Sequence, residues 1–476
     1  MSTIIEVTMT PVPKIKLQYL HRRIRYDGCP LTVYEKLYRN EPCGFIYESL
    51  ESLEKRGRYS MIGSKPYMRF ESCGRKIQIR YSAALFEMEG DPFEALRQLV
   101  PKDHPCPDVL PMPGGAVGYI AYDSIRYVEQ IPDKNPDQLD VPDMNFLFPS
   151  ELIIFDHQEW MADIILYDLA PSEDRMTRLV QEVATSLEKP DIKFDQIPPK
   201  EVRISSNFTR EAFCDIVRRA REYILAGDIF QVVLSQRFTF PLHTNPLNAY
   251  KAIRFTNPSP YMYYLHLNDF HVLGSSPEIM VKLTKDEVNI KPLAGTRRRG
   301  KTEAEDQALA DELLSDVKER AEHVMLLDLA RNDIGRVCQY GSIHWPKTFY
   351  IEYYSKVMHL VSDVYGKILD GKDGFDLVAA SFPAGTVSGS PKVRSMEIID
   401  ELENVRRGVY GGSIGYFGFN GDMDMCIAIR TLLLKAGTGF LQAGAGIVAD
   451  SIPEMEYKET LNKARALIQA VEMMGE

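Results

Sequence analysis

Alternating hydrophobic and polar residues dominate the first 170 residues of the chain. The alternation occurs in MRFESCGRKIQIRY around Gly74 and in the runs ELIIF and DIILY, which flank residues 156–160. A period of two is typical of strands with one buried face, so we expect antiparallel hairpins in this region. The charged, proline-bearing stretch 186–202 interrupts the pattern. We therefore expect a linker there and divide the chain into regions 1–200 and 201–476.

Helical spacing appears after residue 208. Thr209 is the expected N-cap of a helix that ends at Gly227, because apolar residues recur between them every three or four positions. The runs from residue 230 to 293 predict a meander of strands, and 303–335 follows as one long helical pattern. Near the C-terminus, Ser451 and Glu454 have the spacing of a capping box. Runs of strands followed by runs of helices are typical of an α+β layered fold.

The composition narrows the class of protein. The 476 residues are 45% hydrophobic and 26% charged, which is normal for a soluble globular protein. A net charge of −11 argues against nucleic-acid binding, for which a basic face is usual. A small anion could still bind in a locally basic pocket.

Cysteine usage and the absence of an anchoring segment suggest where the protein resides. The seven cysteines are scattered singly, without a Cys-x-x-Cys pair. No stretch approaches 18 uninterrupted apolar residues, and the first residues do not have the pattern of a signal peptide. We therefore expect a reduced cytoplasmic protein with no thiolate metal site and no membrane contact.

Two pairs of acidic residues have helical spacing. Glu319 and Glu322 share one helix face, and Glu456 and Glu459 share another. Most such pairs are solvated surface groups. Both pairs here adjoin apolar stretches that must be buried, and a buried acid needs a partner. Mg²⁺ usually takes one or two carboxylates together with other oxygen ligands, so one glutamate from each helix would suffice.

Glycine-rich loops are a second, weaker signal. The segment SFPAGTVSGSPK opens a helix with Ser390 as the expected cap and Pro391 at its first position, and such a helix start can bind an anion. It lacks the P-loop pattern, and Asn420-Gly421 predicts a hairpin turn in a second glycine cluster. No sequence pattern of a hydrolase triad, zinc protease or dinucleotide site occurs. His359 lies in an alternating strand, where a lone histidine is more often structural than catalytic.

Five segments taken together resemble the chorismate-utilising enzymes: KPLAGTR (291–297), EHVMLLDLARND (322–333), FPAGTVSGSPK (382–392), GVYGGSIGYF (408–417) and GAGIVADSIPEMEYKETLNKA (444–464). The resemblance covers residues 207–467 and implies two packed antiparallel β-sheets flanked by helices. It also implies a bound Mg²⁺, with Glu322 and Glu459 as ligands and Glu319 and Glu456 in support.

The same resemblance assigns roles at the substrate. Glu278 is similar to the general acid that protonates the departing C4 hydroxyl, and His359 to a histidine associated with pyruvate elimination. Tyr410 and Arg430 match positions that bind the enolpyruvyl carboxylate, for which a guanidinium gives bidentate contact. Further substrate contacts are implied at Thr386, Gly444, Gly446 and Lys463.

Two positions distinguish among the reactions of this family. Gln231 replaces a lysine that activates water in isochorismate and salicylate synthases, and a neutral amide cannot act as a general base. Ala294 replaces the nucleophilic lysine of aminodeoxychorismate synthases. Direct addition of ammonia at C2 remains, which is the reaction of anthranilate synthase. The alternatives are 4-amino-4-deoxychorismate synthase component I and a non-catalytic amino-acid-binding regulatory paralogue.

A further set of residues, two of them in the N-terminal region, resembles regulatory elements of anthranilate synthase component I. The similar positions imply a tryptophan site for feedback inhibition, at Glu48, Ser49, Pro260, Tyr261, Met262 and Cys426. The chain has no cysteine in an amidotransferase setting with a later His and Glu. We therefore expect a hetero-oligomer in which a separate glutamine amidotransferase subunit supplies ammonia.

Overall fold

The computed structural model describes residues 15, 17–50, 56–82, 84–109, 111–187, 202–354 and 357–473. Most of the predicted linker 186–202 lies outside these described residues. None of the described helices is long and apolar enough to cross a membrane.

Strands and helices alternate irregularly along the chain. The part before residue 200 contains β1 (Gln18–Arg25), α1 (Pro30–Tyr38), β2 (Cys43–Leu50), β3 (Arg56–Cys73), β4 (Lys76–Tyr81), β5 (Ala84–Glu89), α2 (Pro92–Leu99), β6 (Gly115–Ile120), η1 (Tyr122–Tyr127), β7 (Met144–Asp156), β8 (Met161–Asp168) and α3 (Glu173–Leu187). The next part contains β9 (Ser205–Ser206), α4 (Arg210–Leu225), β10 (Gln231–Pro241), α5 (Pro246–Thr256), β11 (Tyr261–Leu267), β12 (Phe270–Ser276), β13 (Ile279–Thr284), β14 (Glu287–Ile290), β15 (Leu293–Arg298), α6 (Glu303–Ser315) and α7 (Val317–Gly335). The last part contains β16 (His344–Tyr353), β17 (Val357–Lys367), α8 (Gly374–Ser381), η2 (Gly385–Val387), β18 (Gly389–Ser390), α9 (Lys392–Leu402), β19 (Ser413–Gly418), β20 (Met423–Ile427), β21 (Thr431–Lys435), β22 (Thr438–Ile447) and α10 (Pro453–Glu472).

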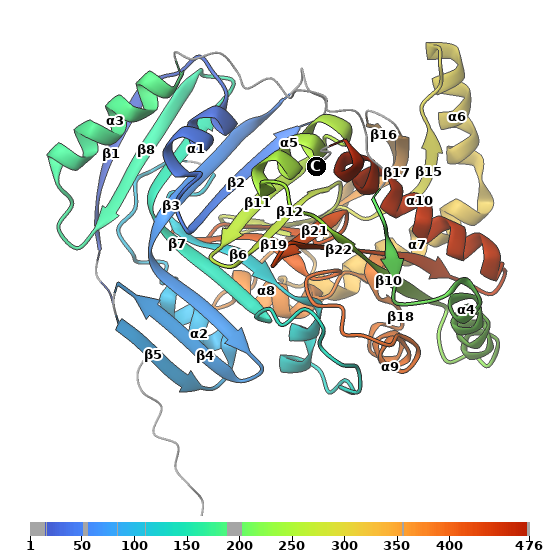
Figure 1. Ribbon diagram of the computed structural model, residues 1–476. Coiled ribbons are helices and arrows are strands. Elements are labelled where there is room, and N and C mark those ends of the chain that lie inside the picture. The colour runs from blue at the N-terminus through green and yellow to red at the C-terminus, as the bar shows by residue number, and fades with distance from the viewer. Residues whose placement is uncertain are drawn as a thin grey trace, which may run out of the picture.

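The predicted α+β class is confirmed. The described strands join into one large antiparallel sheet, and helices surround it (Figure 1). Strands that precede residue 200 pair directly with strands that follow it: β2 forms a ladder with β11, and β6 forms one with β19. The predicted boundary near residue 200 is therefore not a boundary of the sheet.

The sheet is buried on both faces where it carries the core. Along β2, Phe45 and Tyr47 belong to the larger apolar cluster, whereas Ile46 between them belongs to a second cluster. The second cluster lies beneath α1, α3, α5 and α10, which supply residues such as Val33, Val183 and Leu467. Strands covered on both faces form a rigid frame on which connecting loops can present functional groups.

Several local predictions are confirmed. Thr209 caps α4 by accepting a hydrogen bond from the Ala212 amide. The hairpins predicted around Gly74, at 156–160 and at Asn420-Gly421 join β3 to β4, β7 to β8 and β19 to β20. Gly74 adopts a φ of 58°, which glycine tolerates without strain.

The prediction of one helix over 303–335 is wrong. The chain breaks into α6 and α7 at Asp316, whose side chain accepts hydrogen bonds from the amides of Lys318 and Glu319. Aspartate competes with the helix for backbone donors in this way, and the helical spacing on either side does not show the break.

Other local predictions also need correction. Ile452 rather than Ser451 is the N-cap of α10, and Ser451 Oγ instead accepts a hydrogen bond from the Val448 amide. α9 begins at Lys392 with Pro391 at the cap position, because Ser390 pairs with β10 in β18. The predicted meander is interrupted, since α5 separates β10 from β11 and β10 pairs with β22.

Candidate active site

Glu278 occupies the short connection between β12 and β13. Its backbone carbonyl accepts a hydrogen bond from the Ile427 amide at 3.0 Å, and its carboxyl Oε1 accepts one from Thr386 Oγ1 at 2.9 Å. Burial raises the pKa of Glu278 to about 7, although Thr386, Arg430 and Lys463 each lower it. A carboxyl group with this pKa is partly protonated at neutral pH, so it is able to donate a proton there.

Arg430 lies in the turn between β20 and β21, with a φ of 50° that is uncommon for a side-chain-bearing residue. Burial lowers the pKa of Arg430, while Glu278 and Tyr354 raise it. Among the described residues, no group accepts a hydrogen bond from its guanidinium. Since a partly buried guanidinium needs an acceptor, this side chain is prepared to bind an anion such as a carboxylate.

His359 on β17 is held in one tautomer. Its Nδ1 lies 3.0 Å from the carbonyl oxygen of Gly295 and 3.1 Å from Thr296 Oγ1. A carbonyl only accepts hydrogen bonds, so Nδ1 carries the proton and Nε2 keeps a lone pair. Burial lowers the pKa of His359 to about 4, which keeps the ring neutral. Ala294, adjacent to Gly295, is buried and faces Leu360 in the β15–β17 register.

Two glycines of β22 leave space beside two predicted site residues. A Cβ on Gly444 would lie 2.6 Å from the Tyr410 hydroxyl oxygen, and a Cβ on Gly446 would lie 2.6 Å from Gln231 Nε2. The amide oxygen of Gln231 is buried without a hydrogen-bond partner in the described structure. Any side chain at these glycines would fill the space that the hydroxyl and the amide face.

The four predicted glutamates lie on α7 and α10. Burial raises the pKa of Glu322, and Glu319 and Glu459 raise it further, while Lys318 and Lys463 lower it. Glu319 accepts a hydrogen bond from Arg297 at 3.1 Å, but the carboxylate of Glu322 has no hydrogen-bond or ion-pair partner among the described residues. A bound cation would therefore stabilise the ionised carboxylate of Glu322, which other carboxylates surround.

Lys463 connects the glutamates of α10 with the two glycines of β22, Gly444 and Gly446, which together are called the glycine cradle. The half-exposed ammonium of Lys463 lies 2.8 Å from Glu459 Oε1 and donates to the Gly444 carbonyl at 3.0 Å. Burial also raises the pKa of Glu456, with a further rise due to Glu459. In the described ranges, no three His, Cys, Asp or Glu side chains form a ready-made metal centre. Mg²⁺ does not require one, since it retains waters and substrate oxygens as ligands.

A separate cavity of about 270 Å³ is bordered by the six residues that the sequence comparison with known tryptophan sites indicated: Glu48, Ser49, Pro260, Tyr261, Met262 and Cys426. The carboxylate of Glu48, however, is fully buried and accepts hydrogen bonds from Tyr250 at 2.8 Å and Arg254 at 3.0 Å. These contacts link β2 to α5, and Glu48 borders the cavity beside Ser49.

The structure adds residues to both sites that the sequence reasoning missed. Lys282 and Asp424 form an ion pair at 2.8 Å on the cavity wall, and the Tyr261 hydroxyl donates to Asp424 at 3.0 Å. Tyr354 lies beside His359, with ring centroids 5.4 Å apart. In sequence, Lys282 and Asp424 are ordinary polar positions of alternating strands, so no local signal indicates them.

Comparison with known proteins places this geometry in a family. Residues 45–469 match the family described as chorismate binding enzyme. The chain is 45% identical to anthranilate synthase component 1 of Acetivibrio thermocellus, covering 94% of this chain and 93% of that protein. It is 47% identical to anthranilate synthase component 1 of Aquifex aeolicus, with the same coverage. A solved structure of anthranilate synthase component I from Streptococcus pneumoniae superposes with a TM-score of 0.79 at 37% identity, covering 87% of this chain and 92% of that one. The chain therefore belongs to the chorismate binding enzyme family and, within it, to the anthranilate synthase component 1 group.

Proposed function

We propose that this chain is the synthase subunit of anthranilate synthase and converts chorismate and ammonia into anthranilate, pyruvate and water. The observation that carries the proposal is the guanidinium of Arg430, which has no hydrogen-bond partner among the described residues and lies near Glu278, an acid whose pKa is raised to about 7. The first group suits a carboxylate of the substrate, and the second suits a leaving hydroxyl.

Chorismate would be oriented by its two carboxylates. Arg430 and the Tyr410 hydroxyl would hold the enolpyruvyl carboxylate, since Tyr410 faces the space left by Gly444. Thr386, Gly446 and Lys463 would border the ring. Fixing both ends of the substrate places the reacting carbon atoms at defined positions, which is a major source of rate enhancement.

Mg²⁺ fits the acidic residues of α7 and α10. Glu322 and Glu459 would hold the ion, and Glu319 and Glu456 would support them. The fit rests on the pKa of Glu322, which burial and the neighbouring carboxylates raise. A cation bound beside these carboxylates would lower this pKa again. When bound, Mg²⁺ would neutralise negative charge on the ring carboxylate.

Amination requires an acid on the C4 hydroxyl and space at C2. Glu278 would donate its proton to the departing hydroxyl, which leaves as water while ammonia adds at C2. The unpartnered amide oxygen of Gln231 suits an N–H of the incoming ammonia. Ala294 offers no amine of its own, so ammonia would meet no competing nucleophile at that position.

Pyruvate elimination requires a base. The neutral ring of His359, with its lone pair on Nε2, would take the proton from C2 while the C3–O bond breaks. The departing enolpyruvate becomes pyruvate after protonation, and the ring becomes aromatic.

Regulation and ammonia supply complete the proposal. The cavity bordered by Ser49 and Cys426 would bind tryptophan, and the Lys282–Asp424 pair offers both charges to a zwitterion. Ammonia would come from a separate glutamine amidotransferase subunit, in keeping with the component 1 name that the relatives carry.

The main test is the identity of the product. We expect the purified chain to form anthranilate and pyruvate in equal amounts from chorismate, Mg²⁺ and an ammonium salt, detected by fluorescence and mass spectrometry. Glutamine in place of the ammonium salt serves as the control and should yield no anthranilate. Formation of 4-amino-4-deoxychorismate, or of no product, would contradict the proposal.

The pH dependence of turnover tests the general acid. Because Glu278 acts when protonated, kcat/KM should fall as pH rises above about 7, measured at saturating un-ionised ammonia. Thr386→Val removes a hydrogen bond that lowers this pKa, so the alkaline limb should move to higher pH. Glu278→Gln should lose on the order of 10²- to 10⁴-fold in rate. Ser388→Ala, in the same loop, is the control, and an equal displacement of its limb would argue against the assignment.

Metal binding tests the acidic residues. Glu322→Gln should weaken Mg²⁺ binding, measured by calorimetry in the presence of chorismate, and lower turnover by on the order of 10²-fold. Glu454→Gln provides a matched control, because Glu454 lies on α10 but pairs with Arg210. Equal Mg²⁺ affinity in the Glu322 variant and the control would move the metal site elsewhere.

Inhibition by tryptophan tests the cavity. Ser49→Phe should raise the half-inhibitory tryptophan concentration by about tenfold or more, corresponding to about 1.4 kcal/mol, and leave the uninhibited rate unchanged within about twofold. Ser315→Phe adds the same bulk at the exposed end of α6 and should retain full sensitivity. Unaltered inhibition of the Ser49 variant would exclude this cavity as the tryptophan site.

A further inference from the structure

A fully buried ion pair lies behind the proposed chorismate site and takes no part in the mechanism above. The side chains of Arg407 and Glu403 are 1% and 2% exposed. Arg407 Nη2 donates to Glu403 Oε1 at 2.5 Å, and Nε donates to Oε2 at 2.9 Å. Burial of two charges is costly, and such pairs often contribute little net stability. Net stability alone therefore does not account for this pair.

The remaining donors of Arg407 hold backbone segments of the site. Nη1 donates to the carbonyl of Val387 at 2.7 Å, and Nη2 donates to the carbonyl of Val233 at 2.6 Å. Val387 directly follows Thr386, and Val233 pairs with Gly446 across the sheet. One guanidinium thus holds two neighbouring backbone segments of the space assigned to chorismate, the one that follows Thr386 and the start of β10.

The same guanidinium also lies against two tyrosine rings. Its central carbon lies 5.6 Å from the ring centroid of Tyr410 and 4.7 Å from that of Tyr122. Both distances are within the range of a cation–π interaction. Tyr410 carries the hydroxyl that faces Gly444, so Arg407 also fixes the direction of this group.

Glu403 connects the pair to β10 and β22. Its Oε1 accepts hydrogen bonds from the backbone amide and the hydroxyl of Ser235, both at 2.8 Å. Ser235 is the register partner of Gly444, and its hydroxyl accepts a hydrogen bond from Gln442. The carboxylate of Glu403 therefore orients the Arg407 guanidinium through two hydrogen bonds. It also links that guanidinium to Ser235 on β10 and, through Ser235, to Gln442 on β22.

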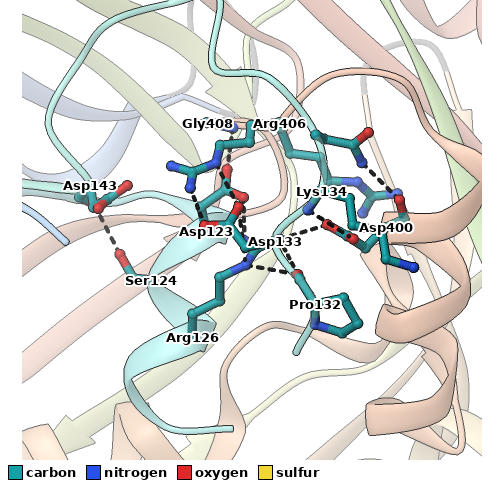
Figure 2. Close-up of polar contacts among 12 residues, drawn as sticks. Asp123, Ser124, Arg126, Pro132, Asp133, Lys134, Asp143, Asp400, Arg406 and Gly408 are labelled. Atoms are coloured by element: carbon teal, nitrogen blue, oxygen red, sulfur yellow. Dashed lines mark hydrogen bonds and ion pairs between the residues drawn. The ribbon is translucent and has the colours of Figure 1, made fainter. Parts of the chain in front are cut away.

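The segment that carries Arg407 is also held from its outer side (Figure 2). Asp123 accepts a hydrogen bond from the Gly408 amide at 2.8 Å, and Asp133 accepts one from Arg406 Nε at 2.9 Å. Arg126 bridges Asp123 and Asp400, which joins η1 to α9. Fixed from both sides, Arg407 has little freedom to change its position.

We propose that Arg407 is a positioning residue, which keeps Thr386, the start of β10 and Tyr410 at fixed spacing around the substrate. This inference rests on the proposed function. The planar fork of arginine is required, because a lysine ammonium is a point charge that cannot direct parallel hydrogen bonds to two carbonyls and a carboxylate. Small displacements of groups that orient a substrate are costly, and a shift of about 1 Å costs on the order of 10²-fold in rate.

The test separates positioning from stability. Arg407→Lys should lower kcat by on the order of 10²-fold, while the dissociation constant of chorismate, measured by calorimetry, changes by less than about tenfold because Arg430 remains. The control is Arg394→Lys, which alters a surface ion pair between Arg394 on α9 and Asp228, and it should keep parental kinetics. Turnover per folded molecule equal to that of the parent in Arg407→Lys would overturn the proposal.

A double variant keeps the test decisive if the lysine variant folds poorly. Glu403→Gln combined with Arg407→Met buries no lone charge, so its thermal unfolding should remain near that of the parent. Its kcat should nevertheless stay low, and normal kcat in this variant would overturn the positioning role. The parental chain is assayed in parallel. If the parent itself forms no anthranilate, the proposed function fails, whereas an active parent with fully active variants refutes the role of Arg407 alone.

Discussion

Backbone hydrogen bonding between distant parts of the chain is the constraint on which this structure depends. β19 lies between β6 and β20, and β2 lies between β3 and β11. The amides and carbonyls of these buried strands must be paired, so the later half of the chain is incomplete without strands from the earlier half. This shared sheet forms the wall of the 270 Å³ cavity and also leads, through β20, to the turn that holds Arg430.

Burial by this sheet also sets the protonation states in the candidate active site. The same physical cause acts in opposite directions, raising the pKa of Glu278 and lowering that of His359. In each case burial favours the uncharged form. The result is that, near neutral pH, Glu278 is partly protonated and His359 is neutral, and neither state depends on an oppositely charged residue in direct contact.

Sequence reasoning succeeded where the signal is local. Thr209 caps its helix, Gly74 makes its turn, and segments with family motifs supplied residues that the fold brings together, such as Glu278 with Thr386. It failed where a single side chain overrides a pattern, as Asp316 does in breaking the helix.

Sequence reasoning also missed what depends on distant backbone. The pairing of β10 with β22 joins residues more than 190 positions apart, for which alternation in either strand gives no register. Arg407 was missed for the same reason, because two of its acceptors are main-chain carbonyls of Val387 and Val233, whose identity leaves no mark in the sequence. Glu48 illustrates the converse: its position at the cavity was indicated, but its carboxylate points to Arg254.

The contacts that link the cavity to Glu278 and Arg430 have a practical meaning for protein engineering. Cys426 borders the cavity, and the next residue, Ile427, donates its amide to the carbonyl of Glu278. Tyr263, which also borders the cavity, forms a hydrogen bond of 2.7 Å between its hydroxyl and that of Thr431. Thr431 directly follows Arg430. Redesign of the cavity from these two strands would disturb turnover along with ligand preference. Substitution of Ser49 on β2, which borders the cavity and takes part in neither of these two contacts, offers a way to alter ligand preference alone.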